Sequence, residues 1–402
     1  MYNGRKMLLI SALMLWVLTG CGNNHSYRFF TENDSYHPVE RPDANYTSGI
    51  LYMASPAKLY EPDETPVLRR LNPYQFNPNE EEGQKASGRH ITLEYGLGQT
   101  FYTPDDISLA SLDAIDRNDR PLSEDRPYAG LLFLQGVIHN YYHNYNKGYG
   151  DLRRSVFGKV GLTGNGSLSE EVHSGVHDSR NLTPPEGWGL QVGQELAFTV
   201  GAEQRNRLYA LGHNRLFGAD IVSNVKGSLG SIYTALEAGV TLRAGFNLPR
   251  SFQENSITEQ QIRGVHSGGD STDGNVIPGM EGDNGLAIPG MDEVEEDDVD
   301  VDTDLPPLSS PSSWHFYVFV GHQTRFVLRD FSLDGRLFNN DIHTVEREPI
   351  VNEFQYGGQI RIADNWTIQA LFAHRDKQFK TQRKEHSFGQ YMIMYQRPFL
   401  LN

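Results

Sequence analysis

The sequence predicts an all-β protein, a closed antiparallel transmembrane β-barrel of about 12 strands. Three observations lead to this prediction. Apolar and polar residues alternate with period two along many segments. These segments run for about ten residues or more, as a tilted strand that crosses a bilayer requires. Aromatic residues lie near the ends of the segments, and helix-period patterns are scarce.

The alternation is clearest in 90–101 and 233–248. In the second segment, one face carries Leu236, Val240 and Leu242, and the other carries Glu237, Thr241 and Arg243. We expect strands at 27–33, 45–54, 90–101, 128–143, 153–166, 190–201, 208–224, 233–248, 314–328, 351–362, 366–374 and 389–399.

A water-soluble β-sandwich is the alternative, because it also alternates apolar and polar positions. The barrel is favoured because the segments are long and their polar faces mix Glu, Arg, Gln, Thr and Gly, which suits a filled lumen. We also expect interfacial aromatic girdles formed by Tyr102, Tyr128, Trp188, Tyr233, Trp314 and Trp366.

The first 21 residues have the layout of a secretory signal peptide. A basic pair, Arg5-Lys6, precedes an apolar run from Met7 to Leu18 that is too short to span a bilayer as a helix. The run ends in Leu18-Thr19-Gly20-Cys21, which resembles a bacterial lipobox. We therefore expect residues 1–21 to be a lipoprotein-type signal ending at Cys21, with ordinary signal cleavage as the alternative.

The β-barrel is expected to occupy residues 22–402, with an acidic insertion at 249–313. Residues 264–313 contain no Lys or Arg but 13 Asp and Glu, so the formal net charge of −16 belongs to this segment. The rest of the chain has 35 basic and 38 acidic residues, which argues against nucleic-acid binding. The insertion lacks the apolar residues needed to fold, so we expect a disordered loop. The polar segment 105–126 has room for a short helix.

Several familiar catalytic motifs are absent from the sequence. It contains no Gly-x-Ser-x-Gly elbow, no P-loop and no His-Glu-x-x-His motif. Two histidine pairs have i, i+4 spacing, which can chelate zinc on a helix. We expect His139 and His143 to mark the interfacial end of a strand, and His173 and His177 to lie on a short connection before a strand.

A small set of polar residues could carry out ester hydrolysis. The imidazole of His177 could take a proton from water near neutral pH. Asp34 and Glu186 could bind a hard cation through oxygen, and such a cation would polarise an ester carbonyl. Asn33 and Thr47 could add hydrogen-bond donors.

Six motifs occur in an order that resembles the outer-membrane lipid A 3′-O-deacylase (LpxR) family, and they extend over about residues 27–201. They are Glu32-Asn33-Asp34, Tyr46-Thr47-Ser48-Gly49, Gly98-Gln99-Thr100-Phe101-Tyr102-Thr103-Pro104, Asp125-Arg126-Pro127-Tyr128-Ala129-Gly130, Glu171-Val172-x₄-His177 and Gly187-Trp188-x₂-Gln191-x₃-Glu195.

This resemblance implies a twelve-stranded barrel that hydrolyses the 3′-linked acyl ester of lipid A with calcium as a cofactor. It also implies that Asn33, Asp34, Thr47 and His177 occupy active-site positions.

Two departures from the family pattern concern the site. The family has an acidic metal ligand between the His and the Trp, and strict spacing places Thr183 there; Asp178 and Glu186 are the carboxylates in that interval. The family type also has a Lys after the Tyr-x-Pro motif. Since residues 103–126 contain no Lys, Arg117 or Arg120 would have to substitute.

The sequence therefore predicts a calcium-dependent esterase in the outer membrane of a Gram-negative bacterium. His177 would be the general base, Asn33 and Thr47 would orient the substrate or the oxyanion, and Asp34 with Glu186 would bind calcium. We expect lipid A or lipopolysaccharide as the substrate and a monomeric barrel. One alternative is a serine-type phospholipase barrel, for which Ser48 and Ser174 are the candidate nucleophiles. Another is a non-catalytic barrel or scaffold.

Overall fold

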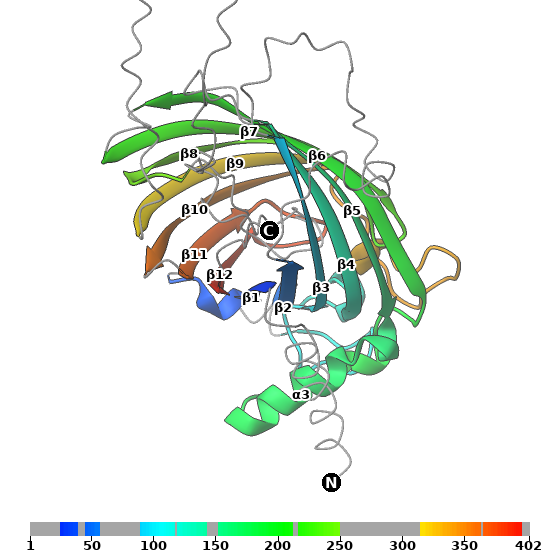
Figure 1. The fold of residues 1–402 in the computed structure, drawn as a ribbon. Helices are drawn as coiled ribbons and strands as arrows, with labels where there is room; N and C mark the ends of the chain where they lie inside the picture. Colours follow the sequence, from blue (N-terminus) through cyan, green and yellow to red (C-terminus); the bar gives the residue numbers. More distant parts are fainter. Residues whose placement is uncertain are drawn as a thin grey trace, which may run out of the picture.

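The computed structural model describes residues 25–38, 45–56, 89–116, 119–142, 152–211, 216–249, 314–362 and 365–395. Twelve strands in these ranges form one closed antiparallel barrel (Figure 1). The strands are β1 (His25–Asn33), β2 (Asn45–Pro56), β3 (Arg89–Thr103), β4 (Ala129–Tyr142), β5 (Leu152–Thr163), β6 (Leu196–Leu211), β7 (Phe217–Gly230), β8 (Tyr233–Phe246), β9 (His315–Asp330), β10 (Ile350–Ile362), β11 (Trp366–Arg375) and β12 (His386–Tyr395).

Each strand pairs with its neighbours in sequence, and β1 closes the ring by pairing with β12. In that last pair, Asn33 lies opposite Gly389 and Tyr27 lies opposite Tyr395. Closure leaves no sheet edge, so every strand can satisfy its backbone hydrogen bonds inside a lipid bilayer. The predicted barrel and its strand number are confirmed.

The two faces of the strands divide as the alternation predicts. In β8, Leu236, Val240 and Leu242 are exposed on the outside, whereas Glu237 and Arg243 are buried in the lumen. Lipid replaces water around the outer face, so these exposed apolar side chains are in their preferred environment.

Ion pairs fill the lumen. Lys226 lies 2.7 Å from Glu237, and Arg325 and Arg375 lie 2.9 Å and 2.6 Å from oxygens of the Glu353 carboxylate. All of these side chains are almost fully buried. Buried charges of this kind need partners, because each loses its hydration. The lumen is therefore packed with paired side chains.

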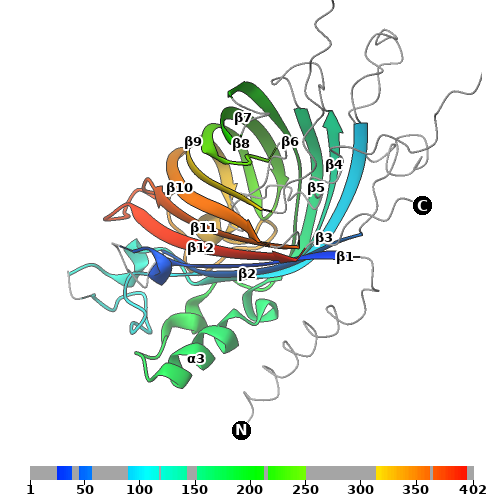
Figure 2. The ribbon, with the colours of Figure 1, turned by 60° about the vertical axis from the view of Figure 1, so that its left-hand side comes forward.

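Short helices lie in the connections at one end of the barrel. They are η1 (Asp34–Tyr36), η3 (Leu122–Glu124), η4 (Gly164–Ser167), α3 (Ser169–Arg180), η5 (Gly187–Leu190) and α4 (Phe331–Asp334). No helix in the described ranges is long and apolar enough to cross a membrane. Figure 2 shows α3 outside the ring of strands, and α3 contacts β3 and β4. The ends of β1, β3 and β5 and the starts of β2, β4 and β6 all lie at this same end, because successive strands are antiparallel.

Two strand predictions have the wrong boundaries. The segment 190–201 is not a single strand, because 187–190 form η5 and β6 begins only at Leu196. The segment 208–224 contains the end of β6 and the first half of β7. The alternation of apolar and polar residues continues through both segments, so the period alone could not locate the turns.

Four of the six predicted girdle aromatics are not interfacial. Trp314 and Trp366 are half-exposed near strand ends, as expected. The buried ones are Tyr102, Tyr128, Trp188 and Tyr233. Tyr102 packs on Phe331 and Arg126, and Tyr128 packs on Trp188, so packing at this end of the barrel covers rings that the sequence assigned to the membrane surface.

Some predictions fall outside the described residues. They are the signal peptide with Cys21, residues 250–313 of the acidic insertion, and His143 and Arg117.

Candidate functional site

Asn33 and Thr47 meet where β1 ends and β2 begins. The side-chain amide of Asn33 donates a hydrogen bond to the backbone oxygen of Thr47 at 2.8 Å. The register between β2 and β3 shifts between Tyr46 and Ser48, so Thr47 is the extra residue of a β-bulge. Bulges redirect side chains and are frequent beside active sites. The Thr47 hydroxyl lies 2.5 Å from the hydroxyl of Thr103 on β3.

Asp34 follows directly and is buried, with 1% of its surface exposed. It begins η1, for which Asn33 is the N-cap, and both Asn33 Oδ1 and Asp34 Oδ1 accept from the Ser35 N–H. The end of this segment folds back onto the barrel, where Tyr36 packs against the ring of Tyr391 at 5.3 Å. The Asp34 carboxylate is therefore held in a short, capped turn at the barrel wall.

The segment containing His173 and His177 is a helix, not the short connection that the sequence predicted. It forms α3, a 12-residue helix with Glu170 and Glu171 in its first turn, where acidic residues favour a helix. It ends at Asn181, which has a left-handed conformation with φ 52°. Its buried face carries Ser169, His173 and His177, at spacings of four residues.

A glycine lets α3 approach the barrel. A Cβ at Gly130 of β4 would lie 2.3 Å from the hydroxyl oxygens of both Ser167 and Ser169, far inside van der Waals contact. The start of α3 therefore packs directly on the strand backbone. Beside it, the Gln99 side chain donates to the Ser167 carbonyl at 2.6 Å.

His177 has a fixed orientation. Its Nδ1 lies 2.5 Å from the carbonyl oxygen of Thr183. A carbonyl only accepts hydrogen bonds, so Nδ1 carries a proton. In the neutral ring Nε2 then has the lone pair, as a general base requires. His177 is 5% exposed.

His173 lies one turn before His177 and is surrounded by aromatic rings. The Trp188 indole N–H donates to His173 Nδ1 at 3.2 Å, and the Phe101 ring lies 5.2 Å away. Phe101, Ile107, Tyr128 and Trp188 form a small apolar cluster of their own. The sequence singled out His173 only as half of a zinc-type pair and assigned no role to its contact with Trp188.

The two parts of the site share the outer face of β3. Glu94 and Tyr102 face the lumen, where they contact Arg28 and Arg126. The alternate residues Phe101 and Thr103 therefore face outward, and both are buried. Thr103 bonds to Thr47 and Phe101 packs against His173, so the Asn33–Thr47 corner and His173 contact two positions of β3 that are about 7 Å apart along the strand. The site is on the outside of the barrel wall, beneath α3.

Comparison with known proteins assigns the chain to a family. The model of the family described as "Outer membrane protein LpxR" matches residues 7–397. The chain belongs to the LpxR family. It is therefore an outer-membrane protein, as the sequence resemblance suggested.

LpxR from Salmonella typhimurium has a similar structure. It aligns with a TM-score of 0.58 and 14% sequence identity, over 92% of this chain and 100% of that chain. This likeness supports the fold of the LpxR-family barrel. No curated protein matches the sequence significantly.

Two autotransporter barrels are more distant. The beta domain of the Bordetella autotransporter BrkA has a TM-score of 0.36 and 10% identity, over 93% of this chain and 99% of its own. The translocator domain of NalP from Neisseria meningitidis has a TM-score of 0.34 and 8% identity, over 98% and 95%.

Three residues lie near the position where this LpxR-family chain lacks the acidic ligand of the family pattern. Thr183, which occupies the expected acidic position, contributes its backbone oxygen to His177. Glu186 is exposed, and its backbone N–H donates to the Ile107 carbonyl at 2.8 Å. Asp178 is exposed on α3. Over the described ranges, no three His, Cys, Asp or Glu side chains gather closely enough to hold a metal ion.

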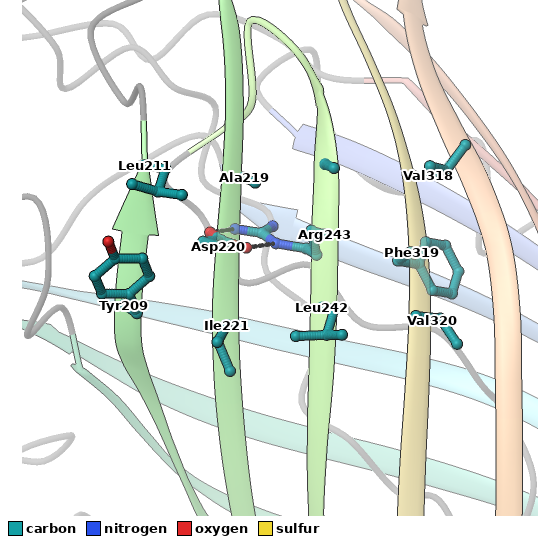
Figure 3. Close-up of a pocket in the computed structure, with 11 residues that line it drawn as sticks. Tyr209, Leu211, Ala219, Asp220, Ile221, Leu242, Arg243, Val318, Phe319 and Val320 are labelled. Carbon is teal, nitrogen blue, oxygen red and sulfur yellow. Dashed lines mark hydrogen bonds and ion pairs between the residues drawn. The ribbon is translucent and has the colours of Figure 1, made fainter.

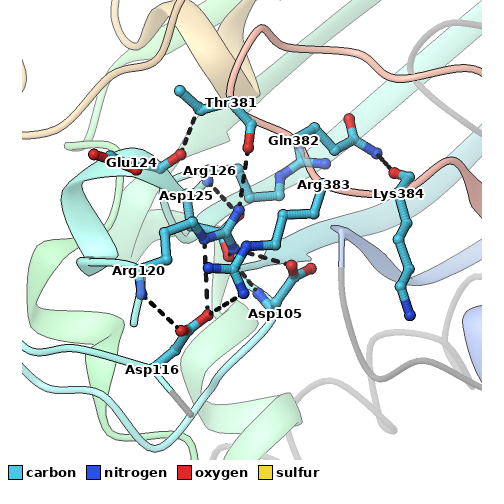
Figure 4. Close-up of polar contacts among 10 residues, drawn as sticks. All are labelled: Asp105, Asp116, Arg120, Glu124, Asp125, Arg126, Thr381, Gln382, Arg383 and Lys384. Carbon is cyan, nitrogen blue, oxygen red and sulfur yellow. Dashed lines mark hydrogen bonds and ion pairs between the residues drawn. The ribbon is translucent and has the colours of Figure 1, made fainter. Parts of the chain in front are cut away.

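Arg120 is committed to a loop–loop connection (Figure 4). It forms ion pairs with Asp105 at 2.9 Å and with Asp125, and its guanidinium donates to the Thr381 carbonyl at 3.3 Å. Burial beside Asp105 raises the pKa of Asp125 to about 6. Arg120 is 4% exposed, so its position indicates a structural role rather than that of the missing Lys.

A hollow of about 440 Å³ lies far from these residues (Figure 3). Its outer lining includes Leu211, Ile221, Leu242 and Val318, near the ends of β6 and β8 and the starts of β7 and β9. These strand ends are at the opposite end of the barrel from His177 and Asp34, so the hollow is separate from the candidate site.

Proposed function

We propose that this protein is an outer-membrane esterase that removes an acyl chain from lipid A. The observation that carries the proposal is the fixed imidazole of His177, which the Thr183 carbonyl holds with Nε2 as the basic nitrogen. The site lies on the outside of the barrel wall, so a lipid could reach it from the membrane without entering the filled lumen.

In this reaction His177 would remove a proton from water as the water oxygen attacks the ester carbonyl carbon. The proton would then pass from His177 to the departing alkoxide, giving a free fatty acid and an alcohol. Asn33 donates to the Thr47 backbone, which holds the hydroxyl of Thr47 at the wall. We propose that these two residues orient the ester or its oxyanion.

Calcium is part of the proposal, with Asp34 as its carboxylate ligand. Asp34 supplies the hard oxygen donor that calcium prefers, and its turn is fixed by capping. Glu186 is the second expected ligand, and its exposed position on the connection before η5 leaves it the weaker candidate. A bound calcium ion would polarise the ester carbonyl and offset the charge of the oxyanion.

A serine-type phospholipase is the second candidate. Neither Ser48 nor Ser174 has a histidine partner among the hydrogen bonds of the described residues. A different serine does: Ser387 lies 2.8 Å from His374 Nδ1, and His374 Nε2 lies 2.6 Å from Glu385. This Ser–His–Glu row resembles a nucleophile with its base and orienting carboxylate. However, this row lies outside the six family motifs, which extend over about residues 27–201.

Mass spectrometry of lipid A tests these proposals together. Cells that express the wild-type protein should lose one ester-linked acyl chain from lipid A, and cells that express His177→Ala should not. Ser387→Ala should behave as the wild type. If only Ser387→Ala abolishes the loss, the serine mechanism is correct. If the wild type leaves lipid A unchanged, the non-catalytic alternative replaces the proposed esterase.

A further inference from the structure

His173 is a buried imidazole that the reaction described above does not use. Only 2% of its surface is exposed, and it lies on the face of α3 that packs against the barrel. Its ring centroid is 4.4 Å from that of His177, and the two rings are nearly perpendicular, at 78°. Its Nε2 is buried and has no hydrogen-bond partner among the described residues. A buried polar atom without a partner is costly, so it calls for an explanation.

Trp188 decides where the proton of His173 lies. An indole N–H can only donate, so Nδ1 of His173 must accept and cannot carry a proton. In the neutral ring the proton is then on Nε2. Burial, and the nearby His177, lower the pKa of His173 to about 3, so the ring is neutral at physiological pH. Nε2 is therefore a neutral N–H donor.

This proton placement disfavours a metal-binding histidine pair. Nε2 of His173 could ligate a metal only if it lost its proton while Nδ1 still accepted from Trp188. That would require an imidazolate or a broken hydrogen bond. The i, i+4 spacing alone suggested zinc, whereas the hydrogen bond to Trp188 opposes it.

The two histidines have opposite proton arrangements. His177 donates from Nδ1 to Thr183 and so has a basic Nε2, whereas His173 accepts at Nδ1 from Trp188 and has a protonated Nε2. One water molecule can form a hydrogen bond with each Nε2, because it accepts through its oxygen and donates through its hydrogens. The two rings are in direct contact, with their centroids 4.4 Å apart.

We propose that His173 is a second catalytic residue, whose Nε2–H holds the oxygen of the nucleophilic water while that water donates to Nε2 of His177. This inference rests on the proposed esterase function. During attack, the new bond forms between the water oxygen and the ester carbon, and the water proton moves to His177. His173 keeps its own proton throughout. It therefore positions the nucleophile without taking part in proton transfer.

The test compares His173→Leu with His173→Gln in purified, refolded protein with lipid A as the substrate. Gln places an N–H donor near the position of Nε2, whereas Leu removes it. We expect His173→Leu to lower kcat about 10²-fold, the effect of misplacing a reacting group by about 1 Å, with little change in KM. His173→Gln should restore most of kcat.

A double-mutant cycle with Trp188→Phe separates proton placement from packing. Phe retains most of the ring contact with Tyr128 but lacks the indole N–H. It should lower kcat in the wild-type background, because the proton of His173 can then move to Nδ1, and should have little effect in the His173→Gln background. Equal losses in both backgrounds would show that Trp188 acts only by packing and would overturn the proton-placement argument.

The controls distinguish this inference from the proposed function. His315→Leu removes another histidine that is 2% exposed but lies at the opposite end of the barrel, and it should leave kcat unchanged. Heat-modifiable migration checks folding for every variant. If His177→Ala is inactive but His173→Leu keeps the wild-type kcat, only the role of His173 is overturned. The same holds if His173→Gln is as slow as His173→Leu. If the wild type releases no fatty acid, both proposals fail.

Discussion

Nδ1 of His177 lies 2.5 Å from the carbonyl oxygen of Thr183, so the backbone of a connecting segment sets the proton arrangement of the candidate base. Strict alignment with the family motif places a threonine where an acidic ligand is expected. The structure gives that position a function that does not depend on its side chain. Loss of the acid therefore leaves the orientation of His177 intact.

Replacement of His177 by alanine should lower the deacylation rate by about 10²–10⁴-fold, because a positioned general base contributes that much. The barrel should still fold, since α3 lies outside the ring of strands. Release of fatty acid from lipid A measures the rate, and heat-modifiable migration measures folding. A folded His177→Ala protein with the wild-type rate would contradict the assignment.

Asp34→Ala should abolish the response to calcium, because it removes the buried carboxylate proposed as a ligand. The wild type should lose activity in chelator and regain it when calcium is restored. Glu186→Gln serves as the comparison, since Glu186 is exposed, and should shift the calcium requirement less than Asp34→Ala does. The calcium requirement of all three proteins is measured from the deacylation rate at increasing calcium concentrations. A wild-type enzyme that is active and indifferent to chelator would remove calcium from the mechanism.

Gly130→Val should displace α3 without unfolding the barrel. The added Cβ would lie 2.3 Å from the hydroxyls of Ser167 and Ser169, so the start of the helix must move. We expect a large loss of activity and faster hydrogen exchange in α3. Gly136→Val is the matched control in the same strand, because its Cβ would meet no atom within 4 Å. Equal losses of activity in the two variants would show that activity depends on the packing of β4 itself and not on its contact with α3.

Acid should weaken the docking of α3 because of His173. Its pKa falls from 6.5 to about 3 when it is buried, so below pH 6.5 an undocked helix binds a proton that the docked helix excludes. The contribution of His173 is fully present above pH 6.5 and is lost as the pH falls towards 3, by at most about 1.4 kcal/mol for each pH unit.

Hydrogen exchange of the peptide 169–180, corrected for the intrinsic pH dependence, measures this effect. His173→Gln should flatten the pH dependence, because glutamine does not titrate. An unchanged pH dependence in this variant would assign the effect to other groups.

The sequence by itself determined the closed barrel and its number of strands. Period-two alternation is a local signal with one cause: each strand has lipid on one side and a polar lumen on the other. It correctly assigned Leu236 and Glu237 to opposite faces and gave the right number of strands. It failed at 190–211, since alternating residues can continue through a turn and a short helix.

Only the tertiary structure revealed α3 and the arrangement beneath it. The buried face of this helix consists of Ser169, His173 and His177, so the positions that face the barrel are polar and do not form an apolar helical stripe. The bulge at Thr47 depends on the register with β3, and the proton on His173 depends on Trp188, 15 residues away in the chain. These are contacts between separate segments. Sequence spacing names residues that could react, but only packing decides which nitrogen donates and which accepts.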